Sequence, residues 1–292
     1  MEKQKFIIDT DIGSDIDDTL CFAYLFEEAR CEILGITTTS SEPWKRAEIV
    51  DTMCRAAGKE IPVFPGLDNP IIGKQRQIAV HQYSVVDKLP HKAYSKENRA
   101  IEFMKRAIEE NPGEVILLAI GPLTNVGALF AAYPHLAKLV KLVAIMGGSF
   151  FEAGRALLRQ EWNVINDPYA AQIVFKSGAN ILVVPLDVSI KTLTSAKEFL
   201  SKEHSGVMKT VAVYTEKFTE RTDEMYYHDV IPAMLVFEKQ IAEIKCGEVS
   251  IDLTDEIGRS DFSENESGNV EMVVDFDVDR FFEIYKTTVN EK

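Results

Sequence analysis

Five aspartates fall within ten residues near the N-terminus, and their number and spacing suit a site for a hard cation. The cluster is Asp9, Asp11, Asp15, Asp17 and Asp18, and it directly follows an apolar run at residues 6–8. Carboxylates this close together repel one another unless protons or a cation neutralise them. An all-oxygen set without histidine or cysteine fits Ca²⁺ or Mg²⁺ better than zinc. One or two acids would indicate helix capping, but five favour a metal-assisted enzyme.

The elements that must position these acids alternate in type through about the first two thirds of the chain. Continuous apolar runs predict strands buried on both faces of a parallel sheet, and the segments between them carry apolar residues at helical spacing. The expected strands are 6–8, 33–38, 115–120, 142–146 and 181–185, and the expected helices are 46–57, 98–110, 123–132 and 168–176. This alternation predicts an α/β fold, a mostly parallel doubly wound sheet with helices on both faces.

The last third of the chain is expected to differ. We expect a helix over 228–240, a hairpin or loops over 247–268, a strand over 270–274 and a closing helix over 278–286. No linker, repeat or low-complexity segment divides the sequence, so a single α/β domain over residues 1–292 is the prediction.

Composition excludes several partners. The formal net charge of -14 argues against a nucleic acid polymer, whose phosphates the chain would repel. No stretch approaches 18 uninterrupted apolar residues, so we expect no membrane span. The first expected strand begins too near the N-terminus to leave room for a secretory signal. A cytoplasmic enzyme is the expectation.

Polar motifs follow several of the expected strands, and ligands of open parallel sheets bind beyond the carboxyl ends of strands. The aspartate cluster follows the first strand, and residues 121–125 follow the third. Residues 147–150 follow the fourth strand, with 161–163 after them, and 228–229 open a late helix. These motifs are expected to meet at one edge of the sheet.

The end of the aspartate cluster is expected to begin a helix. If Ser14 or Asp15 caps this helix, Asp17 and Asp18 lie in its first turn, where the helix dipole favours carboxylates. Asp11 would lie in the preceding loop and face that turn.

Taken in order, these motifs resemble the nucleoside hydrolase family, the inosine–uridine-preferring N-ribohydrolases. Asp9-Thr10-Asp11, together with Gly13 and the Asp17-Asp18 pair, is similar to the family's N-terminal signature, and the resemblance runs from about residue 5 to 285. It implies calcium-dependent hydrolysis of the N-glycosidic bond of a ribonucleoside or related N-riboside, in nucleoside salvage. The products are ribose and free base, and a homodimer or homotetramer is implied.

The resemblance also implies a role for each matching position. The implied Ca²⁺ ligands are Asp11, Asp18, Asp229 and the carbonyl oxygen of Ile120; the implied substrate contacts are Asp17, Glu161, Asn163 and His81. Asp11 would also be the general base for the attacking water, and His228 would assist the departing base. For His81 the alternative is a solvated loop histidine.

The chain departs from the family pattern at several positions. Asp15-Ile16 lengthens the aspartate loop by two residues, and residues 40–42 read Ser-Ser-Glu where the family often has Gly-Asn. Gln82 replaces a glycine after His81, and Val230 replaces a proline after residue 229. Arg155 stands where an asparagine is usual near the sugar, and an arginine there would suit an anionic substituent.

Two alternatives remain open at this point. The altered loops also suit a non-catalytic relative that binds calcium and sugar. Asp15-x-Asp17-x-Thr19 matches DxDxT, the nucleophile motif of Mg²⁺-dependent haloacid-dehalogenase-type phosphatases. That motif should directly follow a buried strand, whereas here residues 12–14 intervene, which disfavours the phosphatase.

Overall fold

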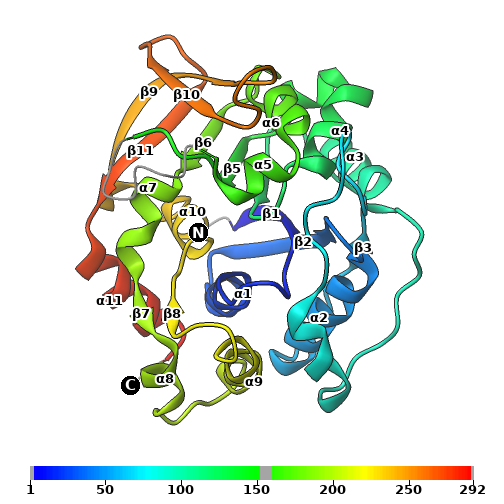
Figure 1. Cartoon of the computed structure of the whole chain (residues 1–292), viewed down its shortest axis with the longest axis vertical. Helices are drawn as coiled ribbons and strands as arrows, with labels where there is room; N and C mark the ends of the chain where they lie inside the picture. The colour runs from blue at the N-terminus through cyan, green and yellow to red at the C-terminus, as the bar shows by residue number, and fades with distance from the viewer. Residues whose placement is uncertain (1–2, 152–159, 291–292) are drawn as a thin grey trace.

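The computed structural model describes residues 3–151 and 160–290, and a nine-stranded sheet runs through it (Figure 1). The strand order is β10-β9-β11-β6-β5-β4-β1-β2-β3. The bounds are β1 Gln4–Thr10, β2 Cys31–Thr38, β3 Val63–Pro65, β4 Val115–Ala119, β5 Leu142–Met146, β6 Ile181–Val184, β9 Ala242–Ile251, β10 Ser260–Glu264 and β11 Val270–Phe276. Pairing is parallel from β11 to β3 and antiparallel only among β11, β9 and β10, which confirms the predicted mostly parallel α/β sheet.

Helices cover both faces of this sheet. Their bounds are α1 Asp17–Glu27, α2 Pro43–Ala56, α3 Ala100–Glu110, α4 Thr124–Ala132, α5 Trp162–Asn166, α6 Pro168–Phe175, α7 Leu186–Ser189, α8 Ala196–Leu200, α9 Met208–Phe218, α10 Val230–Leu235 and α11 Val278–Thr288. Two short strands, β7 Thr194–Ser195 and β8 Glu224–Met225, form a separate antiparallel pair. No helix in the described ranges is long and apolar enough to cross a membrane.

The hydrophobic core has two layers, one on each face of the sheet. Phe6 and Ile8 of β1 pack with α1, α2, α9 and α10, whereas Ile7 between them packs with α3, α4 and α6. This alternation follows from the two-residue period of a strand and explains why the apolar run of β1 is continuous. Burial on both faces therefore fixes β1 rigidly beneath the aspartate cluster.

The chain reverses its direction across the sheet between β1 and β4. From β1 the strands proceed to β2 and β3 on one side, and β4 is followed by β5 and β6 on the other. Such a switch point opens a crevice at the carboxyl ends of the strands, because the connections leave in opposite directions. The aspartate cluster lies at this crevice, directly after β1.

Two local expectations need correction, and the hairpin expected within 247–268 is confirmed. The helix expected over 228–240 runs only over Val230–Leu235, because the N–H groups of Phe237 and Glu238 both donate to the Met234 carbonyl and turn the chain toward β9. Neither Ser14 nor Asp15 caps α1, which begins after Ile16 without a side-chain cap. The segment 247–268 includes a true hairpin: β9 and β10 extend the sheet at its edge, at the top of Figure 1.

Candidate active site

A cavity of about 400 Å³ opens at the switch point, and it gathers nearly all the predicted site residues. Those that line it are Asp11, Asp17, Asp18, Ile120, Glu161, Asn163, His228 and Asp229. A larger groove of about 530 Å³ lies between α8 and α11, but the acidic residues that line it are all exposed. Buried, converging polar groups distinguish a functional cavity from a surface hollow, so the smaller cavity is the candidate active site.

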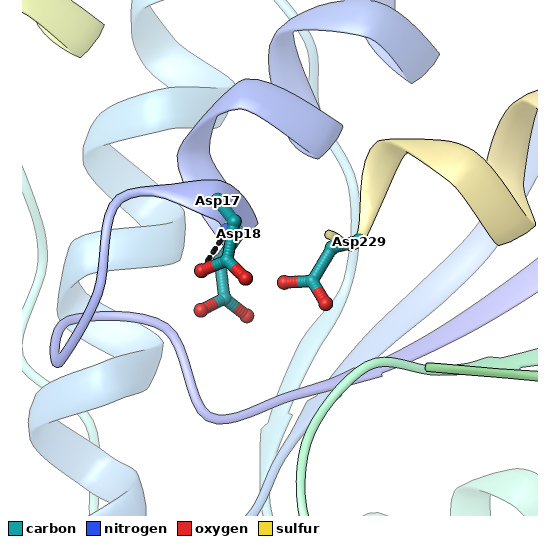
Figure 2. A group of neighbouring side chains, drawn as sticks. All are labelled: Asp17, Asp18 and Asp229. Atoms are coloured by element: carbon teal, nitrogen blue, oxygen red, sulfur yellow. Dashed lines mark hydrogen bonds between the residues drawn. The ribbon is translucent and has the colours of Figure 1, made fainter. Parts of the chain in front are cut away.

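Three buried carboxylates converge at the inner end of this cavity. Asp17 and Asp18 lie in the first turn of α1, and Asp229 directly precedes α10 (Figure 2). One ligand oxygen from each lies within 4.8 Å of the other two. Burial, and then repulsion by neighbouring carboxylates of the site, Asp11 and Asp15 included, raises the pKa of all three well above the usual carboxyl range. An oxygen-only donor set whose own charges are this unfavourable fits a hard divalent cation.

A hydrogen bond between side chains joins the first turn of α1 to the end of β1. The Thr10 hydroxyl, on the last residue of β1, donates to Asp18 Oδ1. Thr10 Oγ1 in turn accepts the N–H of Ile12 at 3.0 Å, and the N–H of Asp18 donates to Asp17 Oδ1 at 3.2 Å. The orientation of the Asp18 carboxylate is therefore fixed by β1 as well as by α1.

Asp11 lines the same cavity from the loop after β1, although it is not a member of the close carboxylate group. Burial raises the pKa of Asp11 to about 6, while the positive charge of Arg46 opposes this rise. The loop after β4 approaches Asp11 so closely that a Cβ on Gly121 would lie 2.8 Å from the Asp11 nitrogen. A carboxylate with a pKa near neutrality suits a general base.

Glu161 and Asn163 join the loops after β4 and β5. Glu161 caps α5: its Oε1 accepts the N–H of Asn163 at 2.7 Å, and its Oε2 accepts the N–H of Gly148 at 2.9 Å. Asn163 Nδ2 donates to the carbonyls of Ile120 at 3.2 Å and Met146 at 3.1 Å. Because both amide hydrogens of Asn163 are used by the backbone, its Oδ1 is the atom left to accept a ligand hydroxyl.

His228 adjoins the carboxylate group and faces the cavity. Its Nδ1 lies 2.7 Å from Ser189 Oγ, and its ring stacks on Tyr226 with centroids 4.8 Å apart. Burial lowers the pKa of His228 to about 4, so the ring is neutral at neutral pH. The direction of the His228–Ser189 hydrogen bond depends on the ring tautomer, and in the tautomer whose proton is on Nε2 the ring can donate to a ligand.

His81 is the predicted site residue that the structure does not bring to the cavity. It begins a 3₁₀ helix, His81–Lys88, and its Nε2 lies 3.3 Å from the Lys217 carbonyl oxygen, against α9. Its neighbour Gln82 turns toward the aspartate loop instead, donating from its backbone to Gly13 and from Nε2 to Asp15, both at 2.9 Å. Arg155 lies outside the described residues.

The mouth of the cavity contains residues without an assigned role from sequence. Trp162 is 49% exposed, and its indole N–H donates to Gln77 Oε1 at 3.1 Å. Arg221 Nη1 donates to the Ser14 carbonyl at 3.0 Å, and the exposed Asp15 lies nearby in the lining. The position of Trp162 between two motif residues was a signal, but the sequence alone does not separate a ligand contact from packing.

The fold and the cavity together define an α/β enzyme with an acidic site at the carboxyl edge of a parallel sheet. Residues 6–283 match the family model for inosine-uridine preferring nucleoside hydrolase, and the chain belongs to this family. It is a hydrolase acting on N-glycosyl bonds. The predicted resemblance is confirmed, and the phosphatase alternative is wrong: β1 ends at Thr10, so Asp15 does not directly follow a strand.

Relatives of known name agree with this assignment. The chain is 31% identical over 267 residues to uridine nucleosidase 1 of Arabidopsis thaliana, covering 85% of this chain and 78% of the relative. A solved plant nucleoside hydrolase, the PpNRh1 enzyme, superposes with a TM-score of 0.85 at 23% identity, covering 99% of both chains. A purine-preferring ribonucleoside hydrolase from Gardnerella vaginalis gives 0.83 at 21% identity over 98% of both chains. At these identities the two structural likenesses concern the fold.

Proposed function

We propose that this protein hydrolyses the N-glycosidic bond of a ribonucleoside or related N-riboside, using Ca²⁺ held at the acidic inner end of the cavity. The observation that carries the proposal is the convergence of Asp17, Asp18 and Asp229 beside Asp11, at the switch point of a nucleoside hydrolase fold. Such a group of buried carboxylates is unfavourable without a cation.

The residues that would hold Ca²⁺ are Asp11, Asp18, Asp229 and the carbonyl oxygen of Ile120. Asp17 is close enough to Asp18 and Asp229 to share the cation, in addition to its expected sugar contact. When bound, Ca²⁺ would supply positive charge that favours deprotonation of the attacking water and orients the ribose hydroxyls. Carboxylates, backbone oxygens and hydroxyls are the ligands that Ca²⁺ accepts in flexible geometry.

Asp11 is the residue best placed to accept the proton of the attacking water. In the metal-free protein burial raises the pKa of Asp11 to about 6, so Asp11 is mostly ionised at neutral pH and able to accept a proton from water. Glycosidic cleavage develops positive charge on the ribosyl ring, and the carboxylates of Asp17 and Glu161 in the same cavity stabilise that charge. Hydroxyl contacts that strengthen as the ring flattens convert binding energy into rate.

His228 is the residue best placed to assist the departing base. Its neutral ring, oriented by Ser189, can donate a hydrogen bond from Nε2 as negative charge develops on the base. Trp162 at the mouth offers a half-exposed aromatic face on which a base can stack. The inner end of the cavity therefore takes the ribose, and the mouth takes the base.

The test is release of reducing sugar from a panel of purine and pyrimidine nucleosides, together with their 5′-phosphates. Protein stripped with EDTA is compared with the same protein resupplied with Ca²⁺ or with Mg²⁺. We expect ribose release from at least one nucleoside, lost after EDTA and restored by Ca²⁺. Binding of Ca²⁺ and ribose without turnover of any member contradicts the proposal and supports the non-catalytic alternative.

A further inference from the structure

Helix α2 places an arginine behind the aspartate loop, away from solvent. The Arg46 side chain is fully buried, with 0% of its surface exposed, and is the largest such side chain in the described residues. Arginine is almost never buried in this way unless its charge and its donors are compensated. Its Nε and Nη1 meet acceptors, whereas Nη2 is buried without a hydrogen-bond partner among the described residues. The atoms that Nε and Nη1 contact therefore indicate what Arg46 does.

Backbone and hydroxyl oxygens of the aspartate loop receive one arm of the guanidinium. Arg46 Nη1 donates to the carbonyl oxygen of Asp11, to that of Ile12 at 2.9 Å and to Ser14 Oγ at 3.1 Å. None of these acceptors is charged, yet the strongest charge interactions of Arg46 are with the carboxylates of Asp11 and Asp18. The guanidinium thus holds the loop through hydrogen bonds to neutral oxygens, while its positive charge interacts with the carboxylates of Asp11 and Asp18.

The loop after β2 is bent to meet the same guanidinium. Arg46 Nε donates to the carbonyls of Ser40 at 3.2 Å and Ser41 at 3.0 Å. Two residues of this segment, Ser40 at φ 65° and Glu42 at φ 57°, have left-handed backbone, which is disfavoured for side chains with a Cβ. Unfavourable backbone of this kind persists where surrounding contacts over-determine it, often at functional sites. Here Arg46 holds the segment through the Ser40 and Ser41 carbonyls, while the N–H of Ser40 donates to the Leu67 carbonyl and that of Glu42 donates to Asp68 Oδ1.

We infer that Arg46 is a positioning residue for the cation site: it joins the loops after β1 and β2 so that Asp11, Asp17 and Asp18 face one cation. This role rests on the proposed function. It depends on the planar fork of a guanidinium, which reaches several acceptors at fixed angles. A lysine ammonium would keep the charge but could not make the same set of bonds.

We expect Arg46→Lys to raise the Kd for Ca²⁺ while the protein remains folded. The matched control is Arg55→Lys on the same helix, where the side chain is 49% exposed and bonds Asp51 at 2.6 Å. Titration calorimetry with CaCl₂ on metal-free protein gives the Kd, and thermal melting followed by circular dichroism shows that each variant is folded. We expect a Kd about tenfold higher for Arg46→Lys and unchanged for Arg55→Lys.

A purely structural role would lower the melting temperature of Arg46→Lys and leave its Kd for Ca²⁺ unchanged, and that result overturns the inference. If Arg46→Lys does not fold, Ser14→Ala decides, because it removes one acceptor and leaves Arg46 in place. We expect about threefold weaker Ca²⁺ binding by Ser14→Ala; wild-type affinity contradicts the inference. Wild-type protein that binds no Ca²⁺ overturns the proposed function itself, whereas normal wild-type binding with unchanged variant affinity overturns only the role of Arg46.

Discussion

At the inner end of the cavity, Asp17, Asp18 and Asp229 are buried and are held directly by helix ends against the sheet, whereas at the mouth Asp15 and Arg221 are exposed and belong to loops. The inner acids match the family's motifs in type and order. The mouth residues include Asp15 of the two-residue lengthening of the aspartate loop, whereas Ile16, the other added residue, is buried in the core. We therefore expect the chemistry to depend on the sheet and its first helix turns, and the choice of substrate to depend on loops.

The hydrogen bonds around the loop lengthening support this division. Ser14 is bonded by Arg46 and Gln77 through its hydroxyl and by Arg221 through its carbonyl. The Asp15 carbonyl accepts from Gln82, but the Asp15 side chain lines the mouth. The added residues therefore leave the inner acids together and add one exposed carboxylate to the lining of the cavity.

The largest effect should come from the inner end. Asp11→Asn removes the proposed general base without changing the size of the side chain, so kcat should fall about 10³-fold. The measurement is ribose release at saturating substrate and Ca²⁺. Asp279→Asn, on the exposed face of α11, is the charge-matched control and should retain full activity. Activity of Asp11→Asn within a few-fold of wild type would place the base elsewhere.

The second-largest effect should be on Ca²⁺ affinity, which should depend on the inner end of the cavity and not on the mouth. Asp229→Asn removes a carboxylate from the close group, so the Kd for Ca²⁺ should rise at least about 100-fold in titration calorimetry. Asp15→Asn, at the mouth, should change this Kd by less than about threefold. An equal rise in Kd for the two variants would show that Asp15 also contributes to Ca²⁺ binding, so that the inner end and the mouth would not differ in this role.

The pH dependence of Ca²⁺ binding follows from the raised pKa values of the inner acids. In metal-free protein Asp17, Asp18 and Asp229 hold protons above the ordinary carboxyl pKa of 3.8. Because Ca²⁺ binds the ionised form, binding should release protons and strengthen as pH rises. Calorimetry in buffers of different ionisation enthalpy, below and above the Asp11 pKa of about 6, measures this release.

The same pKa shifts predict the stability of the metal-free protein. A carboxyl whose pKa is raised by folding binds more protons in the folded state, so its contribution to stability is complete below the unfolded pKa and is lost as pH rises through the folded pKa. Metal-free protein should therefore melt at lower temperature as pH rises from about 4 toward neutrality, and saturating Ca²⁺ should remove the trend. A melting temperature of the metal-free protein that rises over this pH range would show that folding does not raise the pKa of these carboxyl groups.

The smallest effect should come from the mouth. Trp162→Ala removes a stacking surface for the base, so KM should rise about tenfold while kcat changes little. Trp44→Ala is the matched control, since Trp44 lies on α2 beneath Lys96, whose Nζ is 4.4 Å from its ring centroid. A loss in kcat with unchanged KM would move Trp162 from base binding to the chemistry at the inner end.

The sequence predicted the inner end well because its signals are local. Continuous apolar runs marked β1, β4 and β5, and the cavity is lined by Asp11 after β1, by Ile120 after β4, and by Glu161 and Asn163 farther along after β5. The contacts that hold these residues were not predictable in the same way. Arg46 lies on a helix far along the chain from the aspartate loop, and its burial depends on carbonyl directions that side-chain patterns do not encode.

The mouth and the connecting segments were predicted less well for a related reason. His81 and Gln82 are adjacent, and which of them turns toward the aspartate loop depends on the contact of the 3₁₀ helix with α9. The segment from α7 to β8 consists of elements too short to show a period in the sequence. Tertiary packing, rather than local propensity, decides both.

A crystal structure of the protein soaked with Ca²⁺ and ribose would show whether the inner acids hold both the cation and the sugar. We expect one cation between Asp18 and Asp229, in contact with the Ile120 carbonyl, and ribose hydroxyls within hydrogen-bond distance of Asp17 and Asn163. The mouth around Trp162 should remain open to a base. A cation bound at Asp15, or ribose held outside the inner end, would show that the inner acids are not the site of hydrolysis.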